Sequence, residues 1–202
     1  MFSIVIPIFN EAGNIETLIN EIHISLEKKY NKFELILVND ASNDNTIEII
    51  NNLKKKYNII FFNNNFNKGQ SYSICNGINE SKNNTIVTLD GDGQNNPADI
   101  ISLLDKYFSD DDIYLVGGIR QKRKDNLVKI YSSLFANKVR SYIFDDGCKD
   151  TGCSLKVFDR EIFLEFPFFD GIHRFLPALF KGYGYKTDFI NVSHRTRIRG
   201  MS

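Results

Sequence analysis

Val87-Thr88-Leu89-Asp90-Gly91-Asp92-Gly93-Gln94 carries a β-rich apolar run directly into two carboxylates that stand one residue apart. On a continuing strand Asp90 and Asp92 would point the same way, and in a turn just past the strand both can converge on one point. Their carboxylates and the Gln94 amide oxygen are hard ligands, which suit Mg²⁺ or Mn²⁺ and leave positions open for substrate phosphates. Because Asp-Gly pairs are also strong turn signals, an ordinary loop is the alternative.

Apolar runs in the first half of the chain alternate with segments of helical spacing. The runs cover residues 2–8, 33–38, 59–62, 85–89 and 113–117, and the helical segments cover 15–26, 46–57, 71–80 and 97–107. This alternation predicts an α/β fold with a mainly parallel central sheet and helices on both faces. Ligands bind at the carboxyl ends of the strands in such sheets. Since Asn10-Glu11, Asn39-Asp40 and Asp90-Gly91-Asp92 each follow a strand, we expect the site there.

The second half begins with a basic segment. Between Arg120 and Arg140 the only acid is Asp125, a balance that indicates an anionic partner. Apolar residues at helical spacing over 127–142 predict an amphipathic helix. The commoner kind of such a helix docks on its own protein and leaves its basic face in solvent, and the alternative is a helix that lies on an anionic membrane surface. A loop over 145–154, a strand over 155–158, a helix over 171–181, a strand over 186–192 and a basic tail follow.

Composition limits the class of protein. The 202 residues are 42% hydrophobic, enough for one domain with a substantial core, and no linker divides them. A formal net charge of zero argues against a protein that coats nucleic acid, and no stretch approaches the roughly 18 apolar residues of a membrane span. Three cysteines without C-x-x-C spacing, and an N-terminus unlike a signal peptide, favour a cytoplasmic setting. The oligomeric state stays open, a homo-oligomer included.

Several common sites are missing from the sequence. No G-x-G-x-x-G follows the first strand, and neither the P-loop pattern G-x-x-x-x-G-K-[ST] nor the nucleophile elbow G-x-S-x-G occurs. The cysteines and histidines have no zinc spacing. The remaining interpretation is a metal-assisted site for a phosphorylated ligand on an α/β sheet.

Six segments, taken in order, resemble the motifs of one enzyme family. They are residues 4–11 (IVIPIFNE), 38–44 (VNDASND), 67–69 (NKG), 89–97 (LDGDGQNNP), 150–156 (DTGCSLK) and 173–177 (HRFLP). By these motifs the chain resembles glycosyltransferase family 2, which has the Rossmann-like GT-A fold, and within it the dolichyl- and undecaprenyl-phosphate sugar transferases. The resemblance implies a single GT-A domain over 1–202, with a nucleotide-binding half over about 1–118 and an acceptor-binding half over about 119–202.

The resemblance also implies a role for each matching residue. The donor would be held by Pro7, Phe9, Glu11, Val38, Asp40, Asp90, Gly91, Asp92, Arg120 and Arg197, with Asp40 pairing to the base. Asp90, Asp92 and Gln94 would hold Mg²⁺ or Mn²⁺ on the diphosphate, while Arg120 and Arg197 neutralise phosphate charge. Asp150, His173 and Arg174 would lie near the acceptor, and Asp92, Asp150 and Arg120 would carry catalysis.

The implied reaction is an inverting, metal-dependent transfer of a sugar from a UDP- or GDP-linked donor to a polyprenyl phosphate, as in dolichyl-phosphate mannosyltransferases. It places the protein at the cytoplasmic face of the membrane, in peripheral contact with it. Two alternatives stay open: a soluble transferase that acts on a glycan hydroxyl with Asp150 as general base, and a non-catalytic protein that binds a sugar nucleotide. Two departures from the family pattern bear on them. Asn39 replaces the first acid of a pair, and the chain stops at Ser202 without the S-K motif that usually follows.

Overall fold

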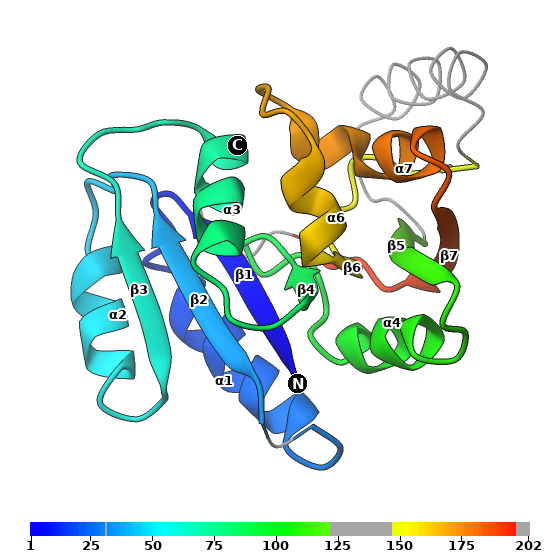
Figure 1. The fold of residues 1–202 in the computed structure, drawn as a ribbon. Helices are drawn as coiled ribbons and strands as arrows, with labels where there is room; N and C mark the ends of the chain where they lie inside the picture. Colours follow the sequence, from blue (N-terminus) through cyan, green and yellow to red (C-terminus); the bar gives the residue numbers. More distant parts are fainter. Residues whose placement is uncertain (31, 122–146, 197–202) are drawn as a thin grey trace.

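The computed structural model, which describes residues 1–30, 32–121 and 147–196, contains one central sheet in the strand order β3-β2-β1-β4-β6-β5-β7 (Figure 1). The strand bounds are β1 Phe2–Ile8, β2 Glu34–Asn39, β3 Ile59–Asn63, β4 Thr85–Thr88, β5 Ile113–Arg120, β6 Lys156–Asp159 and β7 Lys186–Val192. All seven residues of β1 are buried, as expected for a central strand that is covered on both faces.

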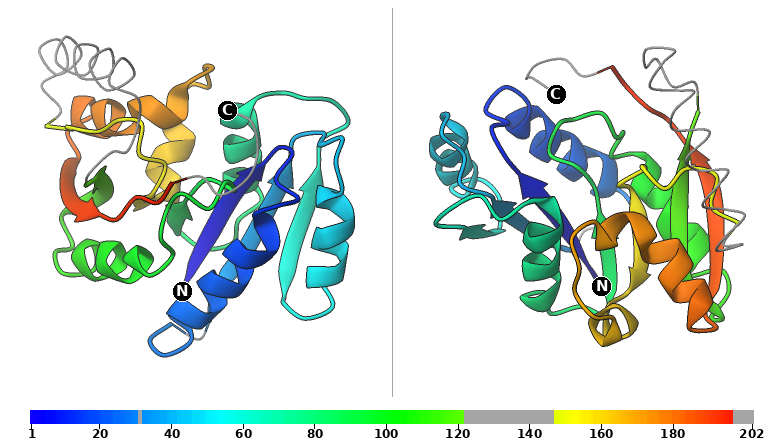
Figure 2. Two further views of the ribbon diagram at one scale, coloured as in Figure 1. Left: turned by 180° about the vertical axis from the view of Figure 1, so that it is seen from behind. Right: turned by 90° about the horizontal axis from the view of Figure 1, so that it is seen from above.

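Helices cover both faces of the sheet (Figure 1; Figure 2). Their bounds are α1 Ile15–Leu26, α2 Thr46–Leu53, α3 Gln70–Asn79, α4 Asp99–Tyr107, α6 Arg160–Glu165 and α7 Ile172–Gly182. Alternate residues of β1 divide the core: Ile4 and Ile6 pack with α1, α2 and α4, whereas Val5 packs with α3, α6 and α7. None of the helices within the described residues is long and apolar enough to cross a membrane.

The predicted α/β class, with a mainly parallel sheet and helices on both faces, is confirmed. β1 pairs in parallel with β2 and β4, β2 with β3, and β5 with β7. Only β6 is antiparallel to its neighbours, β4 and β5, among the strands described here. The two halves of the chain therefore share one sheet, because β6 enters between two strands of the first half.

Some elements differ from the sequence prediction. α6 was not predicted; its six residues begin directly after β6, and the Asp159 side chain caps it by accepting a hydrogen bond from the Ile162 amide at 3.0 Å. α2 ends at Leu53 instead of residue 57, and Pro97 lies in the turn before α4 instead of inside the helix. The amphipathic helix predicted over 127–142 lies outside the described residues.

Candidate functional site

A pocket of about 370 Å³ opens at the carboxyl ends of β1, β2 and β4. Strand polarity brings the residues that follow these three strands to one edge of the sheet, and the loop before α3 forms the facing wall. The pocket is lined by Pro7, Ile8, Phe9, Glu11, Asp40, Asn67, Gly69, Gln70, Asp90, Gly91 and Asp92. Seven of the predicted donor residues are among them, so the structure brings together segments that are about 80 residues apart in the sequence.

Asp40 fastens the loop that forms this wall. Its buried carboxylate accepts hydrogen bonds from the Lys68 and Gly69 amides, each at 2.8 Å, and from the Asn64 side chain at 2.8 Å. Both carboxylate oxygens are thus engaged by the loop. The structure gives Asp40 a role in shaping the pocket, in addition to the predicted contact with a base.

Asn39, the departure from the family pattern, is buried and pairs with the exposed side chain of Asn63. Its side-chain nitrogen donates to Asn63 Oδ1 at 2.6 Å, and its oxygen accepts a hydrogen bond from the Ser42 hydroxyl. As an asparagine it can donate to Asn63 while it accepts from Ser42, whereas an ionised aspartate could only accept. The Val38 side chain packs in the core beneath α3 and does not line the pocket.

Asp90 and Asp92 lie on the floor of the pocket. Asp90 is half-buried, and its carboxylate accepts a hydrogen bond from Gln70 at 2.7 Å. Burial, followed by repulsion from Asp92, raises the pKa of Asp90 to about 6, against the opposing effects of Ser154, Lys156 and Arg120. Gly91 allows the loop after β4 to pass close to the end of β1, because a Cβ added at this position would stand 3.2 Å from the Pro7 carbonyl oxygen.

Asp92 repels the desolvated carboxylate of Asp90, and a divalent cation between the two would stabilise both. Within residues 1–30, 32–121 and 147–196, no three His, Cys, Asp or Glu side chains are grouped to hold a metal by themselves. A cation at Asp90 and Asp92 would therefore need further oxygen ligands from a bound phosphate, which is the usual arrangement for Mg²⁺. Gln94 makes two hydrogen bonds with Arg195. Its backbone oxygen accepts one from the Arg195 amide at 2.9 Å, and its side-chain nitrogen donates one to the Arg195 carbonyl at 3.4 Å.

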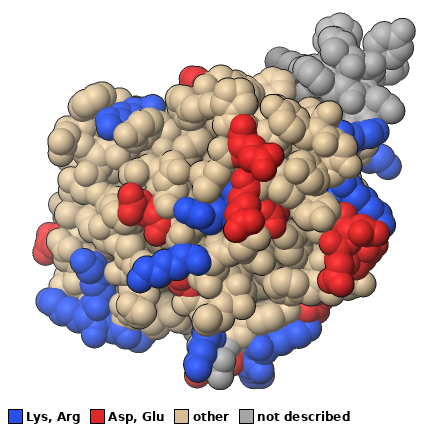
Figure 3. All heavy atoms as spheres, viewed as in Figure 1, with Lys and Arg blue, Asp and Glu red and all other residues tan. Residues whose placement is uncertain are grey.

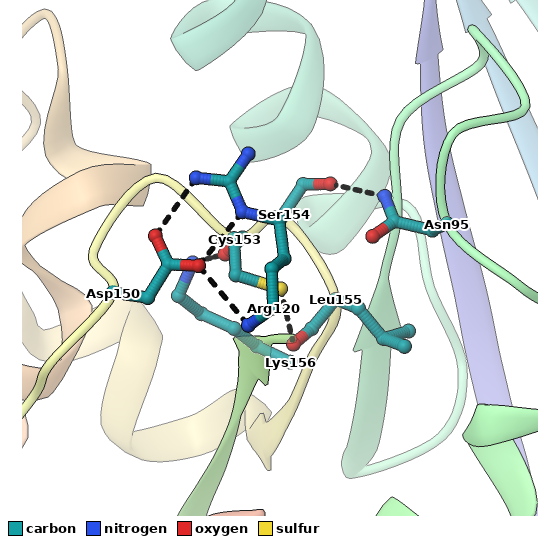
Figure 4. A network of polar contacts seen from close by, with 7 residues as sticks. All are labelled: Asn95, Arg120, Asp150, Cys153, Ser154, Leu155 and Lys156. Atoms are coloured by element: carbon teal, nitrogen blue, oxygen red, sulfur yellow. Dashed lines mark hydrogen bonds and ion pairs between the residues drawn. The ribbon is translucent and has the colours of Figure 1, made fainter. Parts of the chain in front are cut away.

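Arg120 and Asp150 form a bidentate ion pair beside the pocket (Figure 4). Arg120 Nε lies 2.7 Å from Asp150 Oδ2, and Nη2 lies 2.8 Å from Oδ1. The two side chains are only 14% and 6% exposed. Both partners were predicted to act directly on substrates; the structure shows that each also neutralises the other.

Lys156 is a buried cation that the sequence prediction did not assign to the site. Because β6 is antiparallel to β4, Lys156 at the start of β6 pairs with Thr88 at the end of β4, at the site edge of the sheet. Its ammonium group donates to the Cys153 carbonyl (Figure 4). Burial lowers the pKa of Lys156, whereas the charges of Asp90 and Asp150, among others, oppose that shift. Lys156 is thus within electrostatic reach of both Asp90 and Asp150.

His173, at the start of α7, is fixed against the start of α3. Its Nδ1 lies 2.9 Å from the Ser71 hydroxyl, which also accepts the Gly171 amide at 2.7 Å. Burial, and then the charges of Lys156 and Arg174, lower the pKa of His173 to about 4, so the imidazole is neutral at pH 7. Arg174 is exposed beside it, and Arg197 lies outside the described residues.

Several contacts around the site carried no sequence signal that we recognised. Gln70, Ser71 and Ser154 reach the site through pairings across the fold; Ser154, for example, accepts from the Asp90 amide at 3.2 Å and from Asn95 at 2.7 Å. Lys156 could have been noticed as the one charged residue inside the apolar run 155–158.

Comparisons with known proteins agree on one family. The model of the family described as "Glycosyl transferase family 2" matches residues 3–166. A dodecaprenyl-phosphate galacturonate synthase of Rhizobium johnstonii is 31% identical, over 99% of this chain and 60% of its own length. An undecaprenyl-phosphate 4-deoxy-4-formamido-L-arabinose transferase of Shewanella sediminis is 29% identical, over 99% of this chain and 60% of its own length. The chain thus spans about 60% of the length of these curated relatives.

Solved structures resemble the fold. Glucosyl-3-phosphoglycerate synthase of Mycobacterium tuberculosis, in complex with Mn²⁺, UDP and phosphoglyceric acid, has a TM-score of 0.76 at 18% identity, over 98% of this chain and 71% of that one. A mannosyltransferase of Pyrobaculum calidifontis, in complex with GDP-Man and Mn²⁺, has a TM-score of 0.71 at 16% identity. The match covers 98% of this chain and 57% of that one. The fold is therefore GT-A, as the sequence resemblance implied.

Proposed function

The chain belongs to glycosyl transferase family 2, and we propose that it transfers a sugar from a nucleotide diphosphate sugar to a polyprenyl phosphate. The observation that carries this proposal is the half-buried Asp90–Asp92 pair, which lines a pocket at the carboxyl ends of the strands. The names of the relatives support the lipid phosphate as acceptor. The nucleotides and Mn²⁺ in the similar structures support the donor class.

In the proposed donor complex, the nucleoside lies against Pro7, Phe9 and the loop that Asp40 fastens, with the diphosphate directed toward Asp90 and Asp92. These two carboxylates would hold Mg²⁺ or Mn²⁺, with Gln94 as a further candidate ligand. The bound cation would neutralise the charge that develops on the departing diphosphate. Arg120 and Arg197 would add positive charge on the same side.

The acceptor side favours a lipid phosphate over a glycan hydroxyl. A phosphate is already anionic at neutral pH, so its oxygen can attack the anomeric carbon without a strong general base. Asp150, the residue that would serve as a base for a hydroxyl, is instead held in a bidentate pair by Arg120. In-line attack forms the new carbon–oxygen bond as the bond to the diphosphate breaks, and inverts the anomeric centre. Neutral His173 and exposed Arg174 would orient the acceptor phosphate from the start of α7.

This reaction implies a place for the protein at the cytoplasmic face of a membrane, where its lipid acceptor resides. The basic segment after Arg120 would contribute to peripheral contact with anionic lipids.

A transfer assay tests the proposal. UDP- and GDP-linked sugars are incubated with the protein, Mn²⁺ and either undecaprenyl phosphate or free glycans. We expect product only on the lipid phosphate, and a loss of more than a hundredfold in Asp92→Asn. The matched control is Asp111→Asn, at the amino edge of the sheet before β5, which should keep full activity. Glycosylation of the free glycans alone, or undiminished transfer by Asp92→Asn, would refute the assignment.

A further inference from the structure

Exposed aromatic residues gather at the rim of the pocket, on the acceptor side. Phe66 is 65% exposed in the loop before α3, and Phe168 and Phe169 are 56% and 37% exposed in the loop before α7. The Tyr72 ring, at the start of α3, meets the Phe168 ring edge-on at 6.4 Å between centroids. We call these four residues, Phe66, Tyr72, Phe168 and Phe169, the aromatic ridge.

The aromatic ridge is held in place by specific contacts. Lys68 Nζ lies over the rings of Tyr72 and Phe66, at 4.2 Å and 5.2 Å from their centroids, and donates to the Tyr72 hydroxyl at 2.9 Å. Gly171 ends the loop before α7, and its amide donates a hydrogen bond to the Ser71 hydroxyl in α3. The two loops of the ridge are therefore held against the first turn of α3, which limits the entropy that a partner would have to remove on binding.

The position of the ridge matches the expected route of the acceptor. Asn67 and Gly69, on either side of Lys68, line the pocket, and the loop with Phe168 leads directly to His173. In Figure 1 that loop, in orange, projects at the upper end of the molecule, toward which the arrowheads of β2 and β3 also point. The same end is mostly uncharged in the space-filling view (Figure 3).

The chemistry of the ridge fits a bilayer surface better than water. Soluble proteins seldom leave several large aromatic rings side by side in solvent. Aromatic rings settle at the headgroup level of a membrane, and nearby lysine or arginine side chains add attraction to anionic lipids. Lys68 lies within the ridge and Arg174 follows the second loop, while Asp170 is the one acid of that loop.

We propose that the aromatic ridge docks the protein on an anionic lipid bilayer, with Phe168 and Phe169 at headgroup depth and Lys68 and Arg174 beside lipid phosphates. This role deepens the proposed function and rests on it, because a polyprenyl phosphate presents its phosphate at the headgroup level. A protein seated on this ridge would have the rim of its pocket in that plane.

The sequence offers a direct probe, because it contains no tryptophan. Phe168→Trp places a single fluorophore on the ridge, at an exposed position where folding is not at stake. The matched control is Phe108→Trp, at the end of α4, where the phenylalanine is 50% exposed at the amino edge of the sheet. Vesicles of phosphatidylcholine and phosphatidylglycerol, without donor and without polyprenyl phosphate, are added to each variant.

We expect the emission of Phe168→Trp to shift to the blue and to be quenched by brominated lipid, while that of Phe108→Trp does not change. Equal responses of the two variants would overturn the docking role. A second set of vesicles also contains polyprenyl phosphate. A response of Phe168→Trp that appears only with this second set would also overturn the docking role, because the ridge would then bind the acceptor chain and not the bilayer. Since no sugar donor is present, the outcome is independent of the transfer assay.

Discussion

Asp150 and Arg120 illustrate how single residues in this site depend on one another. Each is almost completely buried, and each supplies the charge that the other needs. Removing one partner of such a pair leaves an uncompensated charge away from water, which costs far more than the pair itself contributes. The pair is therefore a structural element of the site as well as a candidate for substrate contact.

The first prediction concerns this pair. Asp150→Asn should lower the free energy of unfolding by about 3 kcal/mol, because Arg120 remains buried without a counter-charge. Urea unfolding measures the change. The control is Asp110→Asn, whose exposed ion pair with Lys186 should contribute little. If both substitutions have the same small effect, the buried pair stabilises the fold no more than an exposed pair does.

His173 provides a prediction on pH. Its pKa is lowered from 6.5 to about 4 in the folded protein. Between pH 4 and pH 6.5 the unfolded chain therefore binds more protons than the folded protein does. The stability due to neutral His173 is therefore complete above pH 6.5 and is lost as the pH falls toward 4. Between pH 7 and pH 5 the loss amounts to about 2 kcal/mol.

The comparison variant is His173→Asn, whose amide can still pair with Ser71 but does not titrate in this range. Groups that titrate in both proteins, Asp90 among them, cancel in the difference. We expect the wild type to lose more stability than His173→Asn on going from pH 7 to pH 5, as measured by urea unfolding at each pH. Parallel pH profiles would show that the imidazole is not held neutral.

At the scale of the elements, local periodicity was enough to predict most of the fold. β1 is a continuous apolar run, and α1 repeats its apolar residues at helical spacing. Both patterns can be recognised from neighbouring residues alone, without knowledge of the tertiary structure. α6 was missed because six residues hold less than two turns, too few for a helical period to be recognised. The antiparallel entry of β6 between β4 and β5 was missed as well, because no local pattern specifies which strands will pair.

The packing of α3 on the sheet gives the third prediction. An added Cβ at Gly77 would lie 2.5 Å from Val5 Cγ1 and 3.1 Å from Val38 Cγ2. Gly77→Ala should therefore push α3 away from the sheet and lower the free energy of unfolding by about 1–3 kcal/mol. Thermal or urea unfolding measures this.

Gly182→Ala is the matched control, because nothing lies within 4 Å of a Cβ at that position in α7. It should leave stability unchanged or raise it slightly, since alanine restricts the unfolded chain. Because the loop before α3 lines the pocket, Gly77→Ala should also weaken nucleotide binding, whereas Gly182→Ala should not. Equal stability of the two variants would contradict the close packing of α3 on β1 and β2.

At the scale of the whole molecule, the site is an outcome of topology. Asp90 and Asp92 could be predicted because they share one segment, and Glu11 and Asp40 because parallel strands end at one edge. Gln70, Ser154 and Lys156 could not, because their places depend on the path of a loop and on the antiparallel β6. The second half of the chain completes the site by inserting a strand that carries Lys156 to the edge where the first half ends.

Thermal unfolding of the wild type and of Asp92→Asn with UDP or GDP, each with and without Mn²⁺, probes the donor site itself. A ligand at about a hundred times its Kd adds about 2.7 kcal/mol, which raises the Tm of a protein of this size by several degrees. We predict such a shift for one of the nucleotides in the wild type, only when Mn²⁺ is present, and none in Asp92→Asn. A shift that is the same without Mn²⁺ or in Asp92→Asn, or the lack of any shift with either nucleotide, would contradict a donor site built on Asp90 and Asp92.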